Sequence, residues 1–484
     1  MRQFAIVQRI LGILLMIFSV SNIPPLFVSL YYADGSHGAF AASFCITLIT
    51  GFIVWSPVRR VSGDMKLRDG FLVVVAFWVV LGLFGAIPLY LSEQPKLSVT
   101  DAVFESISGL TTTGATVIMG LDFLPRGILY YRQQLQWLGG MGIVVLAVAV
   151  LPMLGVGGMQ LYRAEMPGPM KDSKLTPRIT ETAKALWMIY FGLTVTCGLS
   201  YWLAGMELFD AIGHAFSTVA IGGFSTHDAS MGHYESLAIQ LIAIVFMFLA
   251  GVNFALHYTA WRAATPKAYF RDPEFRAFLT LVCVIVTIST AFLVFSNTYD
   301  DLGTAFIRAL FQVVSIGTTT GFTTADYAHW PSFLPMMLLL GSFVGGCAGS
   351  TAGGIKVIRF LLLAKQGVRE INRLIHPSAE IPVKLGNKVV SSHVVQAVWG
   401  FFAAYMSIYA FMYLIMLATG LDEVTAFSAV AACLNNLGPG LGEVASNFAT
   451  LNAPAKWVLV GAMLLGRLEI FTLLVVFSPM FWRK

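Results

Sequence analysis

Residues Arg308 to Thr324 read RALFQVVSIGTTTGFTT, and this stretch decides the fold. Its apolar first part predicts a short helix of about ten residues. The helix is expected to run directly into a loop in which Thr318, Thr319 and Thr320 precede Gly321. Glycine adopts a positive φ at little cost, so Gly321 is the expected turning point of that loop.

The same pattern occurs three more times when the chain is aligned on that glycine. Each copy has an alanine twelve residues before its glycine, and three copies have a serine six residues before it, where the fourth has Ala432. The four copies are DAVFESISGLTTTG ending at Gly114, DAIGHAFSTVAIGG at Gly223, RALFQVVSIGTTTG at Gly321 and TAFSAVAACLNNLG at Gly438. Four matches in register indicate an internal repeat.

The composition places the chain in a membrane. It has 484 residues, of which 57% are hydrophobic and only 11% charged, whereas soluble domains are about 25% charged. Its apolar stretches mostly reach the ~20 residues that a helix needs to cross the hydrocarbon core. They are continuous rather than alternating, which predicts helices and not a barrel of strands. The five cysteines are scattered singly and indicate neither a metal site nor a disulfide framework.

We therefore predict an all-α polytopic membrane protein with two N-terminal helices and four repeats. Each repeat is an outer helix, a short re-entrant helix with its pore loop, and an inner helix, and the four surround one pore in a pseudo-fourfold arrangement. The first helix contains Pro24 and Pro25, where we expect a kink or break. The predicted units are residues 1–60 for the N-terminal helices and 61–158, 159–262, 263–375 and 376–484 for the repeats.

The expected helices can be placed by residue number. The N-terminal helices are expected near residues 4–31 and 40–55. Outer helices are expected near 71–91, 185–203, 277–295 and 394–418, and inner helices near 131–154, 237–260, 335–363 and 456–481.

Positive charge supports this topology, because Lys and Arg accumulate in short cytoplasmic loops. Most of the 30 Lys and Arg fall between repeats or near the two termini. These segments all lie on one side if ten helices span the membrane and the four short ones re-enter. Both termini are then cytoplasmic and the glycine loops open from the outside. The net charge of +5 follows from this inner face and indicates no nucleic-acid partner.

The four loops are the candidate binding site for a cation. Non-helical backbone at membrane depth persists only where it is packed in protein or lines a water-filled path, and rings of backbone carbonyls replace the water shell of a cation. Acidic outer loops favour cations further. The candidate ligands are Thr111, Thr112, Thr113, Gly114, Ala220, Ile221, Gly222, Gly223, Thr318, Thr319, Thr320, Gly321, Asn435, Asn436, Leu437 and Gly438. The alternative, close helix packing at small residues, explains one loop but not four in register.

A second constellation interrupts the third inner helix at residues 342–354, SFVGGCAGSTAGG. Each glycine costs a helix ~1 kcal/mol relative to alanine, so this segment is expected to unwind. The candidate gate residues are Gly345, Gly346, Gly349, Gly353, Gly354 and Arg467. Arg467 lies within the fourth inner helix, where a charge must pair or face water. It is either a cationic barrier that closes the pore with the loop, or a tie between helix and loop.

These residues resemble a known family. The loops TTTGAT, AIGGFST, TTTGFTT and NNLGPG, with GGCAGSTAGGIK and the late GRLEIF, are similar to the TrkH-type members of the Trk/Ktr/HKT potassium transporter superfamily, over essentially the whole chain. The resemblance implies potassium uptake across a bacterial inner membrane, with K⁺ as the transported ion and no organic cofactor. It also implies a homodimer in membrane lipid, a cytoplasmic TrkA-type nucleotide-binding regulatory ring, and an intramembrane loop that blocks the path under the filter. Gly114, Gly223, Gly321 and Gly438 are then the selectivity glycines.

Other functions fit the sequence less well. No GxSxG, HExxH or Walker lysine is present, so an enzyme is not expected. A secondary transporter, such as a symporter for sodium or another small cation, is the serious alternative because broken helices also build midplane sites; its repeats are usually paired and inverted. Only one glycine per loop is shared, which predicts looser selectivity than four TVGYG loops give.

Several polar residues are expected to support these loops. Glu105 and His214 lie on the re-entrant helices and are expected to hydrogen-bond there. Asn253 and His257 are four residues apart on the second inner helix and suggest a polar seam. Arg308 is expected to open its helix and to pair with one of three acidic residues, namely Asp300, Asp301 or Asp326.

Overall fold

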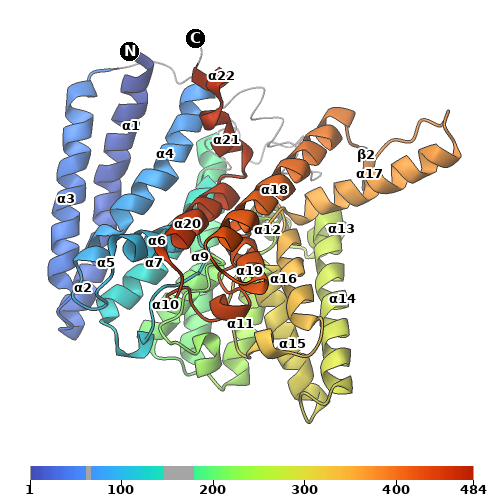
Figure 1. The fold of residues 1–484 in the computed structure, drawn as a ribbon, viewed down its shortest axis with the longest axis horizontal. Helices are drawn as coiled ribbons and strands as arrows, with labels where there is room; N and C mark the ends of the chain where they lie inside the picture. Colours follow the sequence, from blue (N-terminus) through green and yellow to red (C-terminus); the bar gives the residue numbers. More distant parts are fainter. Residues whose placement is uncertain (1, 62–66, 146–178, 483–484) are drawn as a thin grey trace.

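The computed structural model describes residues 2–61, 67–145 and 179–482, and these parts are almost entirely helical (Figure 1). Six of the described helices are long and apolar enough to cross a membrane, and two bent helix pairs raise this number to eight. The chain is therefore a multi-pass membrane protein built from helices. Two short strands, β1 Lys384–Leu385 and β2 Lys388–Val389, form an antiparallel hairpin beyond the long helix α17.

The N-terminal helices pack side by side at one edge of the molecule (Figure 1). The first span consists of α1 Arg2–Ser19, a 3-10 turn η1 Val20–Asn22 and α2 Ile23–Tyr32, and the second is α3 His37–Trp55. The break lies immediately before the two prolines, which occupy the first turn of α2, where proline needs no backbone partner. The predicted break is confirmed.

The outer and re-entrant helices lie close to the predicted positions. The outer helices are α4 Leu67–Gly85 with its continuation α5 Ile87–Leu91, α9 Ile179–Leu203, α14 Pro273–Phe295 and α18 Ser392–Ala418. The short helices are α6 Val99–Leu110, α10 Leu208–Val219, α15 Leu302–Gly317 and α19 Glu423–Leu434. In each pair the short helix packs against the outer helix that precedes it.

The third short helix is longer than predicted. It begins at Leu302, because the Asp301 carboxylate accepts from the backbone N–H of Thr304 and caps the first turn. Arg308 therefore lies in the second turn and does not open the helix. Its guanidinium donates to the carbonyl of Thr324, 2.6 Å away, so the predicted ion pair with an acidic neighbour is wrong for the described residues.

The inner helices are more broken than predicted. The first is α7 Arg126–Val145; its expected end at residue 154, and the boundary at 158, lie outside the described residues. The second is split into α11 Leu237–Ala250 and α12 Phe254–Arg262, the third into α16 Leu334–Val344 and α17 Val357–Ile375, and the fourth into α20 Ala453–Arg467 and α21 Phe471–Phe477. The second and fourth bend by 96° and 113°.

Local chemistry explains the two unpredicted breaks. At the first, the Asn253 side chain accepts from the N–H of Ala255 and starts a new helix immediately after Gly251. Asn253 therefore caps α12, while His257 contacts the neighbouring helix α13 (Lys267–Arg271) through the Tyr269 hydroxyl, 2.8 Å from its Nδ1. At the second, Glu469 and Ile470 both have positive φ, a conformation that no α-helix continues.

Short connecting elements complete the fold. They are η2 Ser56–Val58, η3 Leu121–Phe123, η7 Ser230–His233, η8 Tyr327–His329, η9 Gly442–Val444, α13 Lys267–Arg271 and α22 Pro479–Trp482. The start of α1 and the helix α22 lie at the same end of the molecule, while α17 projects away from the bundle (Figure 1).

Candidate ion pathway

The four glycine loops have one common backbone conformation. In each loop the glycine has positive φ: 81° at Gly114, 78° at Gly223, 86° at Gly321 and 96° at Gly438. The residue two before each glycine is also left-handed, with φ of 52° at Thr112, 54° at Ile221, 66° at Thr319 and 55° at Asn436. Non-glycine residues rarely adopt this conformation, least of all β-branched ones. Their recurrence at one position shows that the loop, not the side chain, determines it.

The loops are held by the same backbone hydrogen bond. In each, the N–H of the residue before the glycine donates to the carbonyl five residues earlier. The pairs are Thr113 to Ser108 at 2.8 Å, Gly222 to Ser217 at 2.8 Å, Thr320 to Ser315 at 2.7 Å and Leu437 to Ala432 at 2.7 Å. The bond uses the backbone of the position six before the glycine, so Ala432 serves as well as a serine there.

The loops also contact one another in cyclic order. A Cβ added to Gly114, Gly223 or Gly321 would lie 2.1 Å from a backbone oxygen of the next loop, and one added to Gly438 would lie 2.8 Å from one. These oxygens belong, in the same order, to Gly222, Thr320, Leu437 and Thr113. The contacts run from loop one to two, three, four and back to one. All sixteen candidate ligand residues are thereby brought together around one centre.

Two carbonyls of each loop have no hydrogen-bond partner among the described residues. One belongs to the left-handed residue two before the glycine, where Thr112, Ile221, Thr319 and Asn436 are almost completely buried. The other belongs to the glycine itself. Buried backbone carbonyls are rarely left unpaired. Four equivalent ones in one ring are therefore suited to a cation.

The side chains of the loops mostly support the loop itself. The Thr111 and Thr318 hydroxyls donate to the carbonyls four residues earlier, both at 2.7 Å, and each pairs with the threonine two residues later. In the fourth loop Asn436 donates to the Thr113 hydroxyl at 2.9 Å and to the carbonyl of Met463 at 3.0 Å. Asparagine thus does in the fourth loop what threonine does in the first and third, namely hold the loop in place.

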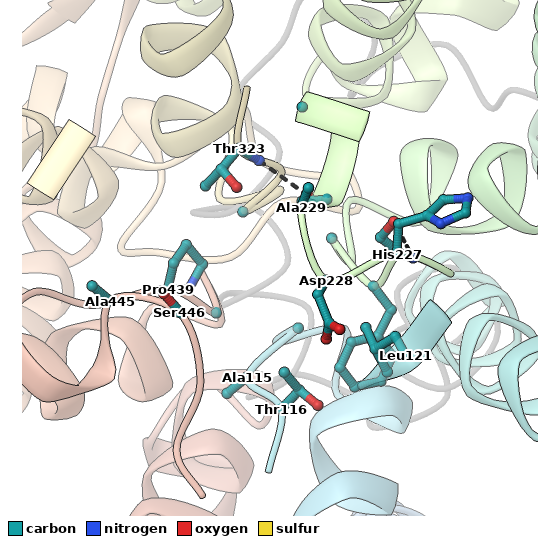
Figure 2. Close-up of a pocket in the computed structure, with 18 of the residues that line it drawn as sticks. Ala115, Thr116, Leu121, His227, Asp228, Ala229, Thr323, Pro439, Ala445 and Ser446 are labelled. Carbon is teal, nitrogen blue, oxygen red and sulfur yellow. Dashed lines mark hydrogen bonds between the residues drawn. The ribbon is translucent and has the colours of Figure 1, made fainter. Parts of the chain in front are cut away.

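A cavity of about 410 Å³ lies above the loops, and all four glycines line it. Figure 2 shows that the segments following the four loops surround this space, from Thr116, Asp228, Thr323 and Pro439. The Asp228 side chain points toward its centre (Figure 2). The loops are therefore open to one side of the molecule and lined there by an acidic group.

A buried ion pair braces the first loop. Glu105 of α6 and Arg132 of α7 are almost inaccessible and lie 2.7 Å apart. Glu105 also accepts from the N–H of Val117, and Arg132 donates to the carbonyl of Ser225, which joins the first loop to the second. The expected support from Glu105 is confirmed. Arg132 was missed, although an arginine in an apolar helix is itself a signal of a buried partner.

His214 braces the second loop in a similar way. Its ring nitrogens lie 2.8 Å from the Asp210 carbonyl and 2.9 Å from the Ser225 hydroxyl. The hydrogen-bonded role predicted for this residue is confirmed.

The predicted glycine-rich interruption lies directly against the loops. After α16 the chain leaves the helix at Gly345, with φ of 67°, and re-enters one at Val357. Within it, Gly353 donates its N–H to the Thr319 hydroxyl at 2.7 Å, Gly354 donates to the Asn435 carbonyl at 3.0 Å, and the Thr351 hydroxyl donates to the Val219 carbonyl at 3.0 Å. The segment 345–356 is called the inner loop below. It thus hydrogen-bonds the third and fourth glycine loops and the end of the helix that leads into the second.

Glycine is required in the inner loop for close approach. A Cβ at Gly353 would lie 1.9 Å from the carbonyl oxygen of Asn435, and one at Gly345 would lie 2.2 Å from that of Gly353. Gly346 and Gly349 face Gly251 and Asn253, at the break of the second inner helix, and Gly354 contacts Ser342. Each predicted gate glycine therefore lies where a larger residue does not fit.

Arg467 points to the inner loop from the fourth inner helix. It is 6% exposed, and its Nη1 donates to the carbonyl of Thr351 at 3.2 Å. Its Nε and Nη2 have no hydrogen-bond partner among the described residues. The nearby Glu469 pairs instead with Arg359, at 2.7 Å. A buried guanidinium without a carboxylate is a concentrated positive charge beside the loop.

Glu274 anchors the inner loop on the other side, and it was missed by the sequence analysis. Its Oε1 accepts from the N–H of Ala348 at 2.7 Å and from that of Ile358 at 3.2 Å. One carboxylate oxygen thereby ties the first part of the loop to the first turn of α17. A carboxylate at the first turn of an outer helix is an ordinary helix feature, so its position alone gave no signal.

Sequence and structure comparisons agree with this architecture. A sequence model of the TrkH family, described as cation transport protein, matches residues 36–484. The chain belongs to the TrkH family. The chain is 57% identical to the Trk system potassium uptake protein TrkH of Salmonella typhimurium over 99% of this chain and 100% of that one. It is 45% identical to the Trk system potassium uptake protein TrkG of Escherichia coli, over 99% of each.

A solved TrkH-family structure has the same fold. The crystal structure of the potassium transporter TrkH from Vibrio parahaemolyticus superposes with a TM-score of 0.92 at 54% sequence identity. It covers 99% of this chain, and 100% of that chain is matched. The all-helical fold described above is therefore that of a TrkH-family protein.

Proposed function

We propose that this chain forms the ion path of a potassium uptake system, with its four repeats arranged in pseudo-fourfold symmetry around one pore. The observation that carries the proposal is the closed ring of loops with an unpaired buried carbonyl at the same position of each. Such carbonyls replace the water shell of K⁺, as the rings of known potassium filters do. The names of the TrkH-family relatives, which state potassium uptake, support the choice of ion.

In this proposal the sixteen loop residues form the filter, and their backbone carbonyls rather than their side chains select the ion. Alternating right- and left-handed residues turn successive carbonyls to one side of a chain, which is why each loop needs two left-handed positions. The carbonyls just before the glycines pack against the neighbouring loop and keep the ring closed. In the second loop this carbonyl, that of Gly222, also accepts from the Gln136 side chain at 2.6 Å. The shared ligands are therefore the unpaired carbonyls.

The inner loop and Arg467 form the gate in this proposal. The loop crosses below three repeats and is pinned by Thr319, Asn435 and Glu274. An uncompensated guanidinium beside it repels cations in a low-dielectric setting, where charges act strongly. Ion flow then requires that the loop move and that Arg467 withdraw from Thr351.

We place the chain in a bacterial inner membrane as a homodimer, with both termini cytoplasmic and the filter open to the outside. The start of α1 and the helix α22 lie at one end of the molecule, as this topology requires (Figure 1). A cytoplasmic TrkA-type nucleotide-binding ring would then meet the end from which the inner loop is released. A coupled symporter for another small cation, such as sodium, is less well supported, because four loops of one orientation build a through-path rather than a midplane pocket.

The test is ion flux in proteoliposomes containing the purified chain. Rubidium, which reports on the potassium path, is expected to enter faster than sodium, and inward flux is expected to need no proton or sodium gradient. Equal rates for rubidium and sodium would contradict a potassium-selective filter. Flux that stops when the proton or sodium gradient is removed would support the symporter instead.

A further inference from the structure

Beside the ion path, three side chains with metal-binding groups meet on the outer surface: Asp122, His227 and His233. Asp122 lies in η3, after the first filter loop, while the histidines lie after the second. One ligand atom from each lies within 4.8 Å of the others. We propose that these three side chains bind a divalent transition-metal ion such as Zn²⁺. This inference does not rest on the potassium filter.

The donor set decides the class of ion. Two imidazoles and one carboxylate suit Zn²⁺, Co²⁺ and Ni²⁺, and three protein ligands with one water complete a tetrahedral Zn²⁺ site. Mg²⁺ and Ca²⁺ prefer oxygen ligands throughout. The site is therefore expected to bind Zn²⁺ and not K⁺, even when K⁺ is in large excess.

His233 is available to a metal. It is exposed, and neither of its ring nitrogens has a hydrogen-bond partner among the described residues. It stacks face to face on His227, with 3.5 Å between the ring centroids and 3° between their planes. The ring nitrogens of His233 are therefore free to bind a metal ion beside His227.

His227 already has the partners of a metal ligand. Its Nδ1 lies 2.5 Å from the Asp122 carboxylate, so an ion there would replace the shared proton. Its Nε2 lies 3.3 Å from Asp210, whose other oxygen accepts from the Thr226 hydroxyl at 2.8 Å. A carboxylate on the far nitrogen orients metal-bound histidines and raises their basicity. Asp210 is therefore the positioning residue of this site.

Binding requires a small rearrangement. Tetrahedral Zn²⁺ with bonds of ~2.1 Å places its ligand atoms ~3.4 Å apart. His227 Nδ1 and the Asp122 oxygen, now 2.5 Å apart, must therefore separate slightly to admit the ion. Stacked rings direct their lone pairs in parallel, so one imidazole must turn about its Cβ–Cγ bond. The His227 ring points away from the outer cavity, whereas Asp228 points into it (Figure 2). The ion would thus bind beside the ion path and link the segments that follow loops one and two.

The test uses the full chain without a polyhistidine tag, purified into lipid nanodiscs. The assay is run near pH ~8, because metal ions bind the deprotonated form of their ligands. Zn²⁺ is expected to raise the melting temperature, because it binds only the folded state. Co²⁺ is expected to give the intense visible bands of a tetrahedral site.

Three variants make the test decisive. His233→Ala is expected to abolish both signals, and Asp210→Asn to weaken Zn²⁺ binding ~10-fold or more. The matched control is His329→Ala, which removes the exposed His329–Asp326 pair, 2.7 Å apart, on another outer segment. It is expected to leave both signals intact. No Zn²⁺ shift in the unaltered chain, an equal shift in His233→Ala, or loss of the shift at 100-fold excess of K⁺ would overturn the proposal.

Discussion

The outer and inner halves of the proposed pore differ in symmetry. In the outer half, four loops of different sequence share two left-handed positions, one backbone hydrogen bond and one cyclic set of contacts. In the inner half the described helices differ more: α11 and α12 meet at 96°, α20 and α21 meet at 113°, and a whole loop separates α16 from α17.

This difference follows from the two tasks. A spherical cation is held best by equal ligands on all sides, so selection requires that every repeat contribute the same atoms. Closing a pore needs only one obstruction on its axis. One repeat can therefore supply the obstruction while the other three hold it in place. Changes in the outer half should therefore alter which ion passes, and changes in the inner half should alter how much passes.

The largest effect is expected from Gly321→Ala in the filter. A Cβ there would lie 2.1 Å from the Leu437 oxygen on a residue with φ of 86°. Backbone strain alone is about 1–3 kcal/mol, which lowers the occupancy of the intact ring by roughly 5- to 160-fold. Rubidium flux should collapse and the preference over sodium should fall.

Gly317→Ala is the matched control for this substitution. Gly317 is the last residue of α15, four residues before Gly321, with open space where its Cβ would be. Flux and selectivity are expected to stay unchanged in it. Wild-type selectivity in Gly321→Ala would show that the loops do not form the filter.

The second-largest effect is expected from a substitution of Arg467 in the inner half, which should raise rubidium flux rather than lower it. Arg467→Ala removes the buried charge and its bond to Thr351, so rubidium flux should rise several-fold without loss of selectivity. Removal of residues 345–354 should act in the same direction. Unchanged or reduced flux in vesicles would contradict a gate at this place.

Arg467→Lys separates the two roles open to this residue. Lysine keeps the positive charge but lacks the planar donor that reaches the Thr351 carbonyl at 3.2 Å. Low flux in this variant supports a cationic barrier. Flux as high as in Arg467→Ala supports a tie between helix and loop.

A smaller effect is expected at Glu274, which holds the inner loop from its edge. Glu274→Ala leaves the N–H groups of Ala348 and Ile358 without their acceptor, at a cost of about 1–3 kcal/mol for a buried group. The melting temperature should fall and flux should rise less than in Arg467→Ala. Glu274→Gln retains an acceptor oxygen, so its melting temperature and flux should lie between those of Glu274→Ala and the unaltered chain. A Glu274→Ala protein with unaltered stability would show that the anchor is dispensable.

The sequence predicted the outer half better than the inner half for a physical reason. Four loops that do one task keep a common register, so the alignment on Gly114, Gly223, Gly321 and Gly438 located every loop. The second left-handed position could not be predicted, because its residues are not of one chemical type. They are Thr112, Ile221, Thr319 and Asn436. Only their backbone is alike, and backbone conformation at a non-glycine residue leaves no mark in a sequence.

The inner half resisted prediction because its breaks depend on distant partners. The inner loop was predictable from five glycines in thirteen residues, which no helix tolerates well. The break after Gly251 depends on the Asn253 cap and on packing of Asn253 against Gly349, which is 96 residues away in sequence. Arg132 and Glu274 likewise act through contacts that span 27 and 74 residues. Local patterns carry no information on such pairs.

The smallest effect is expected from Thr318→Val, which tests whether backbone or side chains select the ion. The Thr318 hydroxyl donates to the Val314 carbonyl and pairs with Thr320, both at 2.7 Å. The fourth loop keeps the same backbone without any threonine, so the isosteric loss should cost about 1 kcal/mol of stability. Rubidium flux should change by less than threefold and the preference over sodium should be retained. A loss of selectivity as large as that in Gly321→Ala would instead make the hydroxyl a direct ligand, and the outer half would then be symmetric in its fold but not in its chemistry.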